Sequence, residues 1–403
     1  MRVPFASFSE ETAGVSMRAS SGPHGNEHRG RENLPARPRI LPTVELRDLP
    51  PDARVVVRTT NWLGDVMISL PALRALRERF PDGHLAVQIR ANLAELLAGV
   101  SWIDEVLPLE IRSGVAGLGD RLRAARALRE RRFDLAVLFP NSFDSALLPF
   151  LAGIPRRLGY ARDGRGPLLT DPQPATAGIR AVHQVRYYLN LLAPLGVVEA
   201  DLAPVLEIPP RAAATASALL AELPGEGPVL ALAAGSAYGR AREWPEENFA
   251  RLAQILAARH GARFVLVGAP REVEQCRTVV ELAGDLPGSG MLITAGRTTP
   301  ADLAALLARC DGFFGNDSGA MHVAAAVGIP TLAIFGSTNP ANTRPLGPRA
   351  EIFVSDRECS PCMARTCRYG HYGCLTDFTP EMVAQRLESM GIFGPAETEG
   401  GAP

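Results

Sequence analysis

The 403-residue sequence contains no lysine, so all 42 of its basic residues are arginines. This absence excludes a Walker A phosphate loop and Schiff-base catalysis, because both need an ε-amino group. The sequence also lacks a basic surplus, since its net charge is -1, and nucleic acid is therefore not an expected partner. No segment approaches the roughly 18 to 20 consecutive apolar residues of a membrane span, and the first 45 residues lack the apolar core of a secretory signal. These absences predict a cytoplasmic protein.

Short apolar runs alternate with helical patterns from residue 54 onward, which is typical of parallel sheets covered by helices. The pattern predicts an α/β protein with two Rossmann-like domains whose parallel sheets face one another across a cleft. We expect a disordered extension at 1–45, in which Met17 offers a later start. An N-terminal domain at 46–205, a C-terminal domain at 206–378 and a final helix and tail at 379–403 would follow.

The expected strands and helices place polar segments at the carboxyl ends of strands, where such sheets bind ligands. In the first domain we expect strands at 54–58, 84–89 and 134–139 and helices at 66–79, 118–132 and 182–195. In the second we expect strands at 229–233, 264–268, 312–315 and 331–335 and helices at 245–259, 271–283, 299–308, 319–327 and 380–390.

The segment Asn316-Asp317-Ser318-Gly319 connects a buried strand to a helix. Free backbone N–H groups at a helix start can bind an anion, and small side chains let a phosphate approach them. We therefore interpret the turn as a diphosphate site. The alternative is that Asp317 or Ser318 caps the helix. His322, one turn further on, would contact the same phosphate or pack in the core.

Asp65 lies in the first βα turn, directly after Gly64. A carboxylate at this position can take a proton from an attacking hydroxyl, which makes Asp65 a candidate general base. The alternative is a helix cap. Because a helix N-terminus favours the ionised form, we expect an available but weak base, whose role depends on position more than on basicity.

The loop at 234–245 contains Gly235, Ser236 and Arg242, and it could close over a phosphate through the planar guanidinium. A solvated loop is the alternative. Glu272 and Thr298 follow neighbouring strands, where a nucleoside would lie. Glu272 would then bond ribose hydroxyls, unless it is only a first-turn helix acid.

Four of the six cysteines fall within sixteen residues, at Cys359, Cys362, Cys367 and Cys374. A structural metal site, reduced thiols that pack a loop, and redox or disulfide chemistry are the three interpretations. Their spacing fits no common zinc pattern well.

Several of these segments together resemble glycosyltransferase family nine, the ADP-heptose:lipopolysaccharide heptosyltransferases, and most of all its heptosyltransferase II members. The motifs are Asn-Trp-Leu-Gly-Asp at 61–65, Pro-Ala-Leu at 71–73, Pro-Asn-Ser at 140–142, Gly-Ile-Pro-Arg-Arg-Leu-Gly-Tyr at 153–160, Asn-Asp-Ser-Gly at 316–319 with Met-His at 321–322, Phe-Gly-Ser-Thr at 335–338, and Cys-Ser-Pro-Cys at 359–362 with Gly-His at 370–371. The resemblance covers about residues 54 to 390. It implies a GT-B fold with the acceptor in the N-terminal domain, ADP-heptose in the C-terminal domain and a final helix at about 380–390 that crosses back to the first domain. It also implies an inverting single displacement that requires no cofactor or metal.

The resemblance also assigns roles to residues. Asp65 matches the catalytic aspartate, and Asp317, Ser318, Gly319 and His322 match the donor-binding turn. Where family members have a lysine two residues before Trp-Pro, this chain has Arg242, which keeps the charge but changes the reach. The acceptor is a phosphorylated, carboxylate-bearing glycolipid. We expect it to contact Asn61, Asn141, Ser142, Arg156 and Arg157.

We therefore predict a peripheral enzyme of the inner membrane's cytoplasmic leaflet. It would transfer heptose from ADP-L-glycero-D-manno-heptose to heptosyl-Kdo-lipid A. Its partners would be ADP-heptose, a Kdo-lipid A type acceptor and an anionic membrane surface, which an arginine-rich face at 121–132 could contact unless that face is merely solvated. The alternatives are another family-nine acceptor, as in heptosyltransferase I, or a non-catalytic nucleotide-sugar-binding module. An NAD oxidoreductase is disfavoured, because neither turn has the Gly-x-Gly-x-x-Gly pattern.

Overall fold

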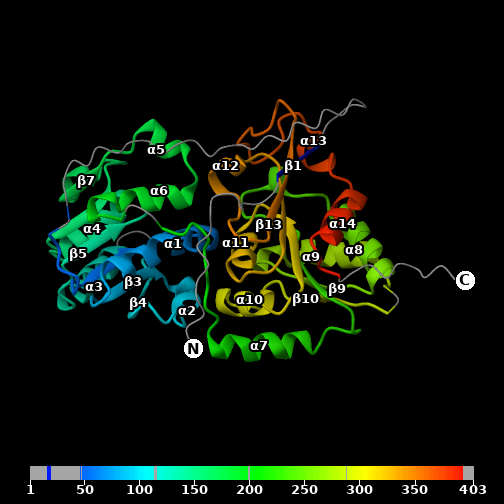
Figure 1. Ribbon diagram of the computed structural model, residues 1–403, viewed down its shortest axis with the longest axis horizontal. Coiled ribbons are helices and arrows are strands. Elements are labelled where there is room, and N and C mark those ends of the chain that lie inside the picture. Colours follow the sequence, from blue (N-terminus) through cyan, green and yellow to red (C-terminus); the bar gives the residue numbers. More distant parts are fainter. Residues whose placement is uncertain are drawn as a thin grey trace, which may run out of the picture. The chain divides into compact units, whose positions relative to one another are not determined.

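The computed structural model describes residues 16–19, 46, 48–112, 116–197, 200–286 and 288–393. The chain divides between Pro209 and Pro210 into two units, each built on its own parallel sheet (Figure 1). Unit 1 precedes this division, and unit 2 follows it and includes Ser16–Ala19. The α/β class with two Rossmann-type sheets is therefore confirmed. Within the described ranges, no helix combines the length and apolar content needed to cross a membrane.

The sheet of unit 1 has the strand order β4-β3-β2-β5-β6-β7, with all neighbours parallel. Counted in chain order this is 3-2-1-4-5-6, the doubly wound order, whose direction reverses between β2 and β5. Its strands are β2 (Val55–Arg58), β3 (Leu85–Arg90), β4 (Glu105–Leu109), β5 (Leu135–Leu138), β6 (Arg156–Tyr160) and β7 (Asp171–Gln173). Its helices are α1 (Leu63–Arg79), α2 (Ala94–Leu97), α3 (Ala116–Glu130), α4 (Phe143–Leu151), α5 (Ala177–Ala181) and α6 (Gln184–Leu191).

The sheet of unit 2 has the order β1-β13-β12-β11-β8-β9-β10, again entirely parallel. Without β1 it repeats the order 3-2-1-4-5-6, and its direction reverses between β8 and β11. Its strands are β1 (Ser16–Ala19), β8 (Val229–Ala233), β9 (Arg263–Leu266), β10 (Met291–Ile293), β11 (Gly312–Asn316), β12 (Thr331–Phe335) and β13 (Ala350–Ser355). Its helices are α7 (Pro210–Leu220), α8 (Glu246–His260), α9 (Val273–Ala283), α10 (Pro300–Leu307), α11 (Gly319–Ala326), α12 (Pro340–Thr343), α13 (Gly373–Thr376) and α14 (Pro380–Ser389).

Two segments at the ends of the chain need separate description, namely Ser16–Ala19 and the final helix α14. Ser16–Ala19, inside the extension for which we predicted disorder, pairs with β13 as a strand, while most of that extension lies outside the described residues. The final helix, α14, packs against α8 of its own unit. The predicted domain boundaries and the crossing of this helix to the first domain stay predictions.

Local sequence explains why these elements begin where they do. The start of α10 is a capping box, in which the Thr299 hydroxyl accepts from the Asp302 N–H and the Asp302 carboxylate accepts from the Thr299 N–H. Strands β2, β5, β8 and β12 are continuous apolar runs that are buried along almost their whole length. This is typical of parallel strands covered by helices on both faces.

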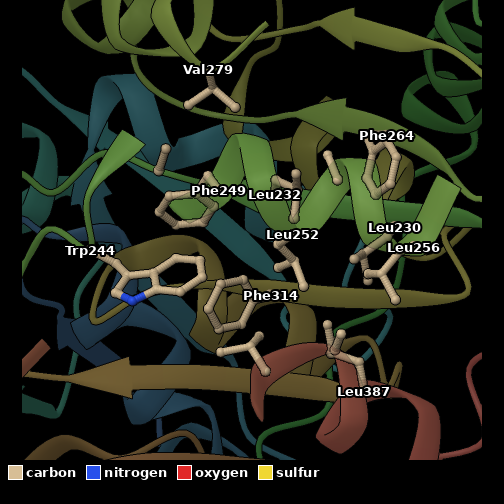
Figure 2. Close-up of a cluster of buried hydrophobic side chains, with 14 of the residues drawn as sticks. Leu230, Leu232, Trp244, Phe249, Leu252, Leu256, Phe264, Val279, Phe314 and Leu387 are labelled. Carbon is tan, nitrogen blue, oxygen red and sulfur yellow. The ribbon is translucent and has the colours of Figure 1, made fainter. Parts of the chain in front are cut away.

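An aromatic cluster anchors the core of unit 2 (Figure 2). The rings of Trp244, Phe249 and Phe314 meet with centroid separations of 5.0 to 5.4 Å. Trp244 is fully buried, and its indole N–H donates to the carbonyl of Phe378 at 2.9 Å. Leu387 of α14 lies in the same cluster. The loop after β8 is therefore fastened to the C-terminal part of the unit.

Candidate active site

Asp65 lies at the carboxyl edge of unit 1, where the strand order reverses. It belongs to the first turn of α1, whose N-cap is Trp62. The structure therefore does not support the alternative that Asp65 is the cap. Asn61, Asn141 and Ser142 follow β2 and β5 at this same edge.

Burial controls the acidity of Asp65. It raises the pKa of this carboxyl from 3.8 to about 6. Tyr188 of α6 is buried close by, and its own pKa lies well above the usual value because of burial and, secondarily, the charge of Asp65. This raised pKa differs from the expectation of a weak base at the helix start, and its cause is the loss of hydration on burial. A carboxylate with this pKa is well suited to accept a proton near neutral pH.

The polar groups around Asp65 are held by specific bonds. The Asn61 side-chain oxygen accepts from the Arg58 guanidinium at 3.0 Å. The Asn141 side-chain oxygen accepts from the Tyr187 hydroxyl at 3.0 Å. Ser142 is the N-cap position of α4. Burial lowers the pKa of Arg58 to about 10, and Asp144 partly offsets that effect. An incompletely solvated guanidinium at this edge is well placed for an anionic ligand.

Arg156 and Arg157 lie elsewhere. They begin β6, which runs parallel to β5, so they lie at the amino edge of the sheet and not beside Asn141. Arg156 forms a two-pronged pair with Asp171, with distances of 3.0 and 2.6 Å. Arg157 donates to the Leu168 carbonyl at 2.6 Å. Both guanidinium groups therefore support the fold here, and the structure does not bring them to the other predicted acceptor residues.

Arg58 and Tyr188 were missed by the sequence interpretation. Arg58 ends the first predicted strand, so its position next to Asn61 could have been recognised. Tyr188 comes from a helix more than 120 residues after Asp65, and no local motif points to it. Only the packing of α1 against α6 brings Tyr188 close to Asp65.

In unit 2, Asp317 directly follows β11, at the point where that sheet reverses its strand order. Its carboxylate is 3.1 Å from the Arg242 guanidinium and accepts from the Thr338 hydroxyl. Burial raises the pKa of Asp317, while Arg242 and Thr338 oppose that rise. Arg242 also lies over the Tyr238 ring, 3.8 Å from its centroid. The sequence-predicted Asp317 and Arg242 thus come together from two separate loops.

The start of α11 presents polar atoms that lack partners. Ser318 is the N-cap position, yet within the described part of the chain its buried hydroxyl has no hydrogen-bond partner. The same holds, among the described residues, for the Nε of Arg242 and the hydroxyl of Ser337. Buried polar atoms normally pair, so this group indicates a site prepared for a polar ligand. Gly319 begins α11, and His322 is buried one turn later.

Asn316 fixes the loop that carries Arg242. Its side chain accepts from the Trp244 N–H at 2.9 Å and donates to the Ala234 carbonyl. The buried Ser236 hydroxyl is 3.5 Å from the Asp317 carbonyl. These bonds connect both ends of the loop to the end of β11, so the position of Arg242 is set by the sheet.

Glu272 packs across two neighbouring strand ends. A Cβ added to Gly235 would lie 2.6 Å from the Glu272 Cδ, and one added to Gly268 would lie 2.8 Å from its Oε2. That oxygen also accepts from the Ala269 N–H at 2.8 Å. Thr298 follows β10, the outermost strand, and is partly buried. Glu272 therefore lies at the carboxyl edge of the sheet, beside the ends of β8 and β9, and it closes the first turn after β9.

The four clustered cysteines are free thiols. Burial raises the pKa of Cys374 to about 11, and the other three thiols add to this rise. Burial also raises the pKa of Cys367, but backbone N–H groups of residues 369–372 bond to its sulfur and lower it overall. Across the described ranges, no group of three or more His, Cys, Asp or Glu is arranged to hold a metal ion. The structural metal stays a prediction, and metal content below about half an equivalent in protein purified without a chelating tag would contradict it.

The cysteine segment packs against the loop that carries Arg242. The Tyr238 hydroxyl donates to the Met363 carbonyl at 2.7 Å, and the Ala241 N–H donates to the Arg365 carbonyl at 3.1 Å. The Ser360 hydroxyl donates to the Gly336 carbonyl at 2.7 Å. Residues 360–365 therefore form one wall of the unit 2 site.

Comparisons with known proteins agree with this geometry. The model of the family described as "Glycosyltransferase family 9 (heptosyltransferase)" matches residues 121–373. Lipopolysaccharide heptosyltransferase 2 of Salmonella typhimurium is 30% identical over 343 residues, which is 84% of this chain and 98% of that protein. The solved structure of Escherichia coli ADP-heptose lps heptosyltransferase II is similar with a TM-score of 0.70 and 28% identity, covering 84% of this chain and 98% of that one. A family 9 glycosyl transferase from Veillonella parvula gives a TM-score of 0.73 at 25% identity, covering 85% and 98%.

Proposed function

This chain belongs to glycosyltransferase family 9, the heptosyltransferases, and on that premise we propose that it transfers heptose from ADP-heptose to the inner core of lipopolysaccharide. The acceptor we propose is heptosyl-Kdo-lipid A, as for a heptosyltransferase II. The observation that carries the proposal is the similarity to lipopolysaccharide heptosyltransferase 2 along 84% of this chain and 98% of that protein.

We assign the donor to unit 2. The diphosphate would accept from the backbone N–H groups at the start of α11 and from the unpartnered Ser318 hydroxyl and Arg242 Nε. Asp317 is already held by Arg242, and it would meet a sugar hydroxyl. Glu272, at the end of the neighbouring strand, would bond the ribose. Ser236 and Thr298 would complete this edge.

We assign the acceptor to unit 1. Its attacking hydroxyl would bond to Asp65, while Asn61, Asn141 and Ser142 orient the glycolipid and Arg58 meets its anionic groups. Arg156 and Arg157 are left out of this proposed site because of their place at the opposite edge. This assignment explains why the carboxylate of Asp65 lies at the same edge as these polar side chains and Arg58.

The chemistry is a single displacement. The acceptor oxygen forms a bond to the anomeric carbon of heptose while the bond from that carbon to the diphosphate oxygen breaks, and Asp65 takes the hydroxyl proton. Negative charge then develops on the leaving ADP, where Arg242 and the positive end of α11 stabilise it. Attack from the side opposite the leaving group inverts the anomeric centre.

The place of the reaction follows from the acceptor. Because Kdo-lipid A is a membrane lipid, we propose that the protein works at the cytoplasmic surface of the inner membrane as a peripheral protein.

The experiment that tests the proposal measures ADP release from ADP-heptose with monoheptosyl-Kdo-lipid A, for the wild type and for D65N. We expect acceptor-dependent release that falls by about 10² to 10⁴-fold in the variant. The same assay with an acceptor that lacks the first heptose distinguishes addition of the first heptose from addition of the second. If the protein binds ADP-heptose but releases no ADP with any acceptor, it would instead be a binding module.

A further inference from the structure

Unit 1 exposes large apolar side chains on two adjacent helices. Leu118 and Leu122 of α3 are 59% and 55% exposed, and Phe143 and Phe150 of α4 are 49% and 45% exposed. The helices contact each other (Figure 1). The Arg121 guanidinium lies 2.5 Å from the Asp144 carboxylate across them. We call the outer surface of these two helices the α3–α4 face.

The apolar residues of α4 are periodic. Phe143, Leu147 and Phe150 recur with helical spacing along its outer side, and Leu147 is partly buried. Leu151, at the end of the helix, packs against the core of the unit. The inner side, with Ala146, Leu148 and Pro149, is already buried against the sheet. A helix that is apolar on both sides normally has both sides covered. The outer side is therefore an unusual surface for a protein in water.

Arginines surround this surface. Helices α3 and α4 carry four arginines and three carboxylates, and two more arginines directly follow α3; the arginines are Arg121, Arg123, Arg126, Arg129, Arg131 and Arg132, and the carboxylates are Asp120, Asp144 and Glu130. The side chains of Arg123 and Arg126 are 71% and 82% exposed. The Arg126–Glu130 pair is exposed at both partners and is therefore weak. The carboxylate of Asp120 is buried, but it also accepts from Arg112, so it keeps a partner when Arg123 turns to another anion.

We propose that the α3–α4 face docks on an anionic lipid bilayer, with the apolar side chains inserted at the headgroup boundary and the arginines on lipid phosphates. Apolar residues framed by arginines match that surface in both chemistry and charge. A second copy of this chain is a poorer match, because a symmetric pairing would bring arginines against arginines.

The α3–α4 face lies next to the edge of unit 1 at which we propose that the acceptor binds. Helix α4 begins two residues after Asn141, at the edge that carries Asp65, and Trp62 at this edge is 64% exposed. Asp144, in the first turn of α4, also acts electrostatically on Arg58. Docking would therefore bring the bilayer to the edge where a lipid-linked acceptor must enter. This part of the inference rests on the proposed function.

The test is co-sedimentation of the full chain with phosphatidylcholine vesicles, with and without phosphatidylglycerol. We expect binding only to the anionic vesicles and weaker binding at high salt. L122S/F150S should weaken it at least about ten-fold, since two large side chains lose their contact with lipid. R123S/R126S should weaken it by a similar factor. L282S, which changes a 45% exposed leucine of α9, is the matched control and should bind like the wild type.

Activity separates this inference from the proposed function. On a delipidated, soluble acceptor the four proteins should turn over alike, whereas on vesicle-embedded acceptor only the face variants should lose rate. Face variants that sediment like the wild type would overturn docking whether or not ADP is released. Equal binding to neutral vesicles, or a dimer that the face variants dissociate, would overturn it as well. If no acceptor supports turnover, the proposed function fails while the sedimentation result still decides the docking.

Discussion

Replacing Asp65 by asparagine should make the protein more stable while it lowers turnover by about 10² to 10⁴-fold. Burial raises the pKa of Asp65 from 3.8 to about 6, so at neutral pH the fold holds a charged carboxylate that is less well solvated than in the unfolded chain. A shift of about two pKa units corresponds to at most about 3 kcal/mol in the free energy of unfolding at neutral pH. Asparagine has the same shape without the charge, so D65N should regain part of this free energy.

The pH dependence has a definite sign. Because the pKa in the fold lies above its unfolded value, the destabilisation is absent below about pH 4 and complete above about pH 6. Urea unfolding should therefore show D65N more stable than the wild type at pH 7.5, with the difference gone near pH 4. E274Q, which changes an exposed first-turn acid of α9, should show no such gain and serves as the control.

The pH dependence of turnover should reflect the ionisation of the same carboxyl group, Asp65. In the wild type, kcat/KM for ADP release should fall about ten-fold per pH unit below about pH 6, because only the carboxylate accepts a proton. An ordinary aspartate would keep the rate level to about pH 4. A rate that stays level through pH 5, a D65N protein with normal turnover, or a D65N protein less stable than the wild type would each refute the reasoning.

Substitutions at three further positions test unit 2. R242K keeps the charge but loses the planar fork and the stacked ring contact, so the KM for ADP-heptose should rise several-fold in steady-state assays, and R242A should raise it further. G235A places a Cβ 2.6 Å from the Glu272 Cδ and should weaken ADP binding in calorimetry with little change in kcat; unchanged affinity would exclude a donor role for this edge. W244F leaves the Phe378 carbonyl without its donor and should lower the free energy of unfolding by about 1 to 3 kcal/mol in urea titrations, and a smaller loss would show that the bond is dispensable.

Regular elements were predictable where the sequence pattern was strong. The strands Val229–Ala233 and Thr331–Phe335 were predicted with their observed bounds, because both are continuous apolar runs bounded by turn residues. The short strands β6 and β7 were missed. Arg156 and Arg157 make β6 look polar, and Pro172 interrupts β7. Their pairing comes from the sheet and not from local propensity.

The site was predictable to the extent that it lies in motifs. Asp65 and Asp317 follow strands at the edges where ligands bind, and the structure places both there. The acceptor arginines were placed from their nearness in sequence to Asn141. That reasoning ignored the fact that a crossover through α4 returns the chain to the opposite edge. The raised pKa of Asp65 could not be predicted either, because it depends on burial produced by distant segments such as α6.

Asn316 has three structural roles. It ends a core strand, holds the backbone of Trp244 and Ala234, and so sets the position of Arg242. In evolutionary terms, few substitutions at this position would preserve all three roles. A substitution of Asn316 that moved this loop would also disturb the buried Trp244, so the position of Arg242 and the packing of the core cannot be changed separately at this residue.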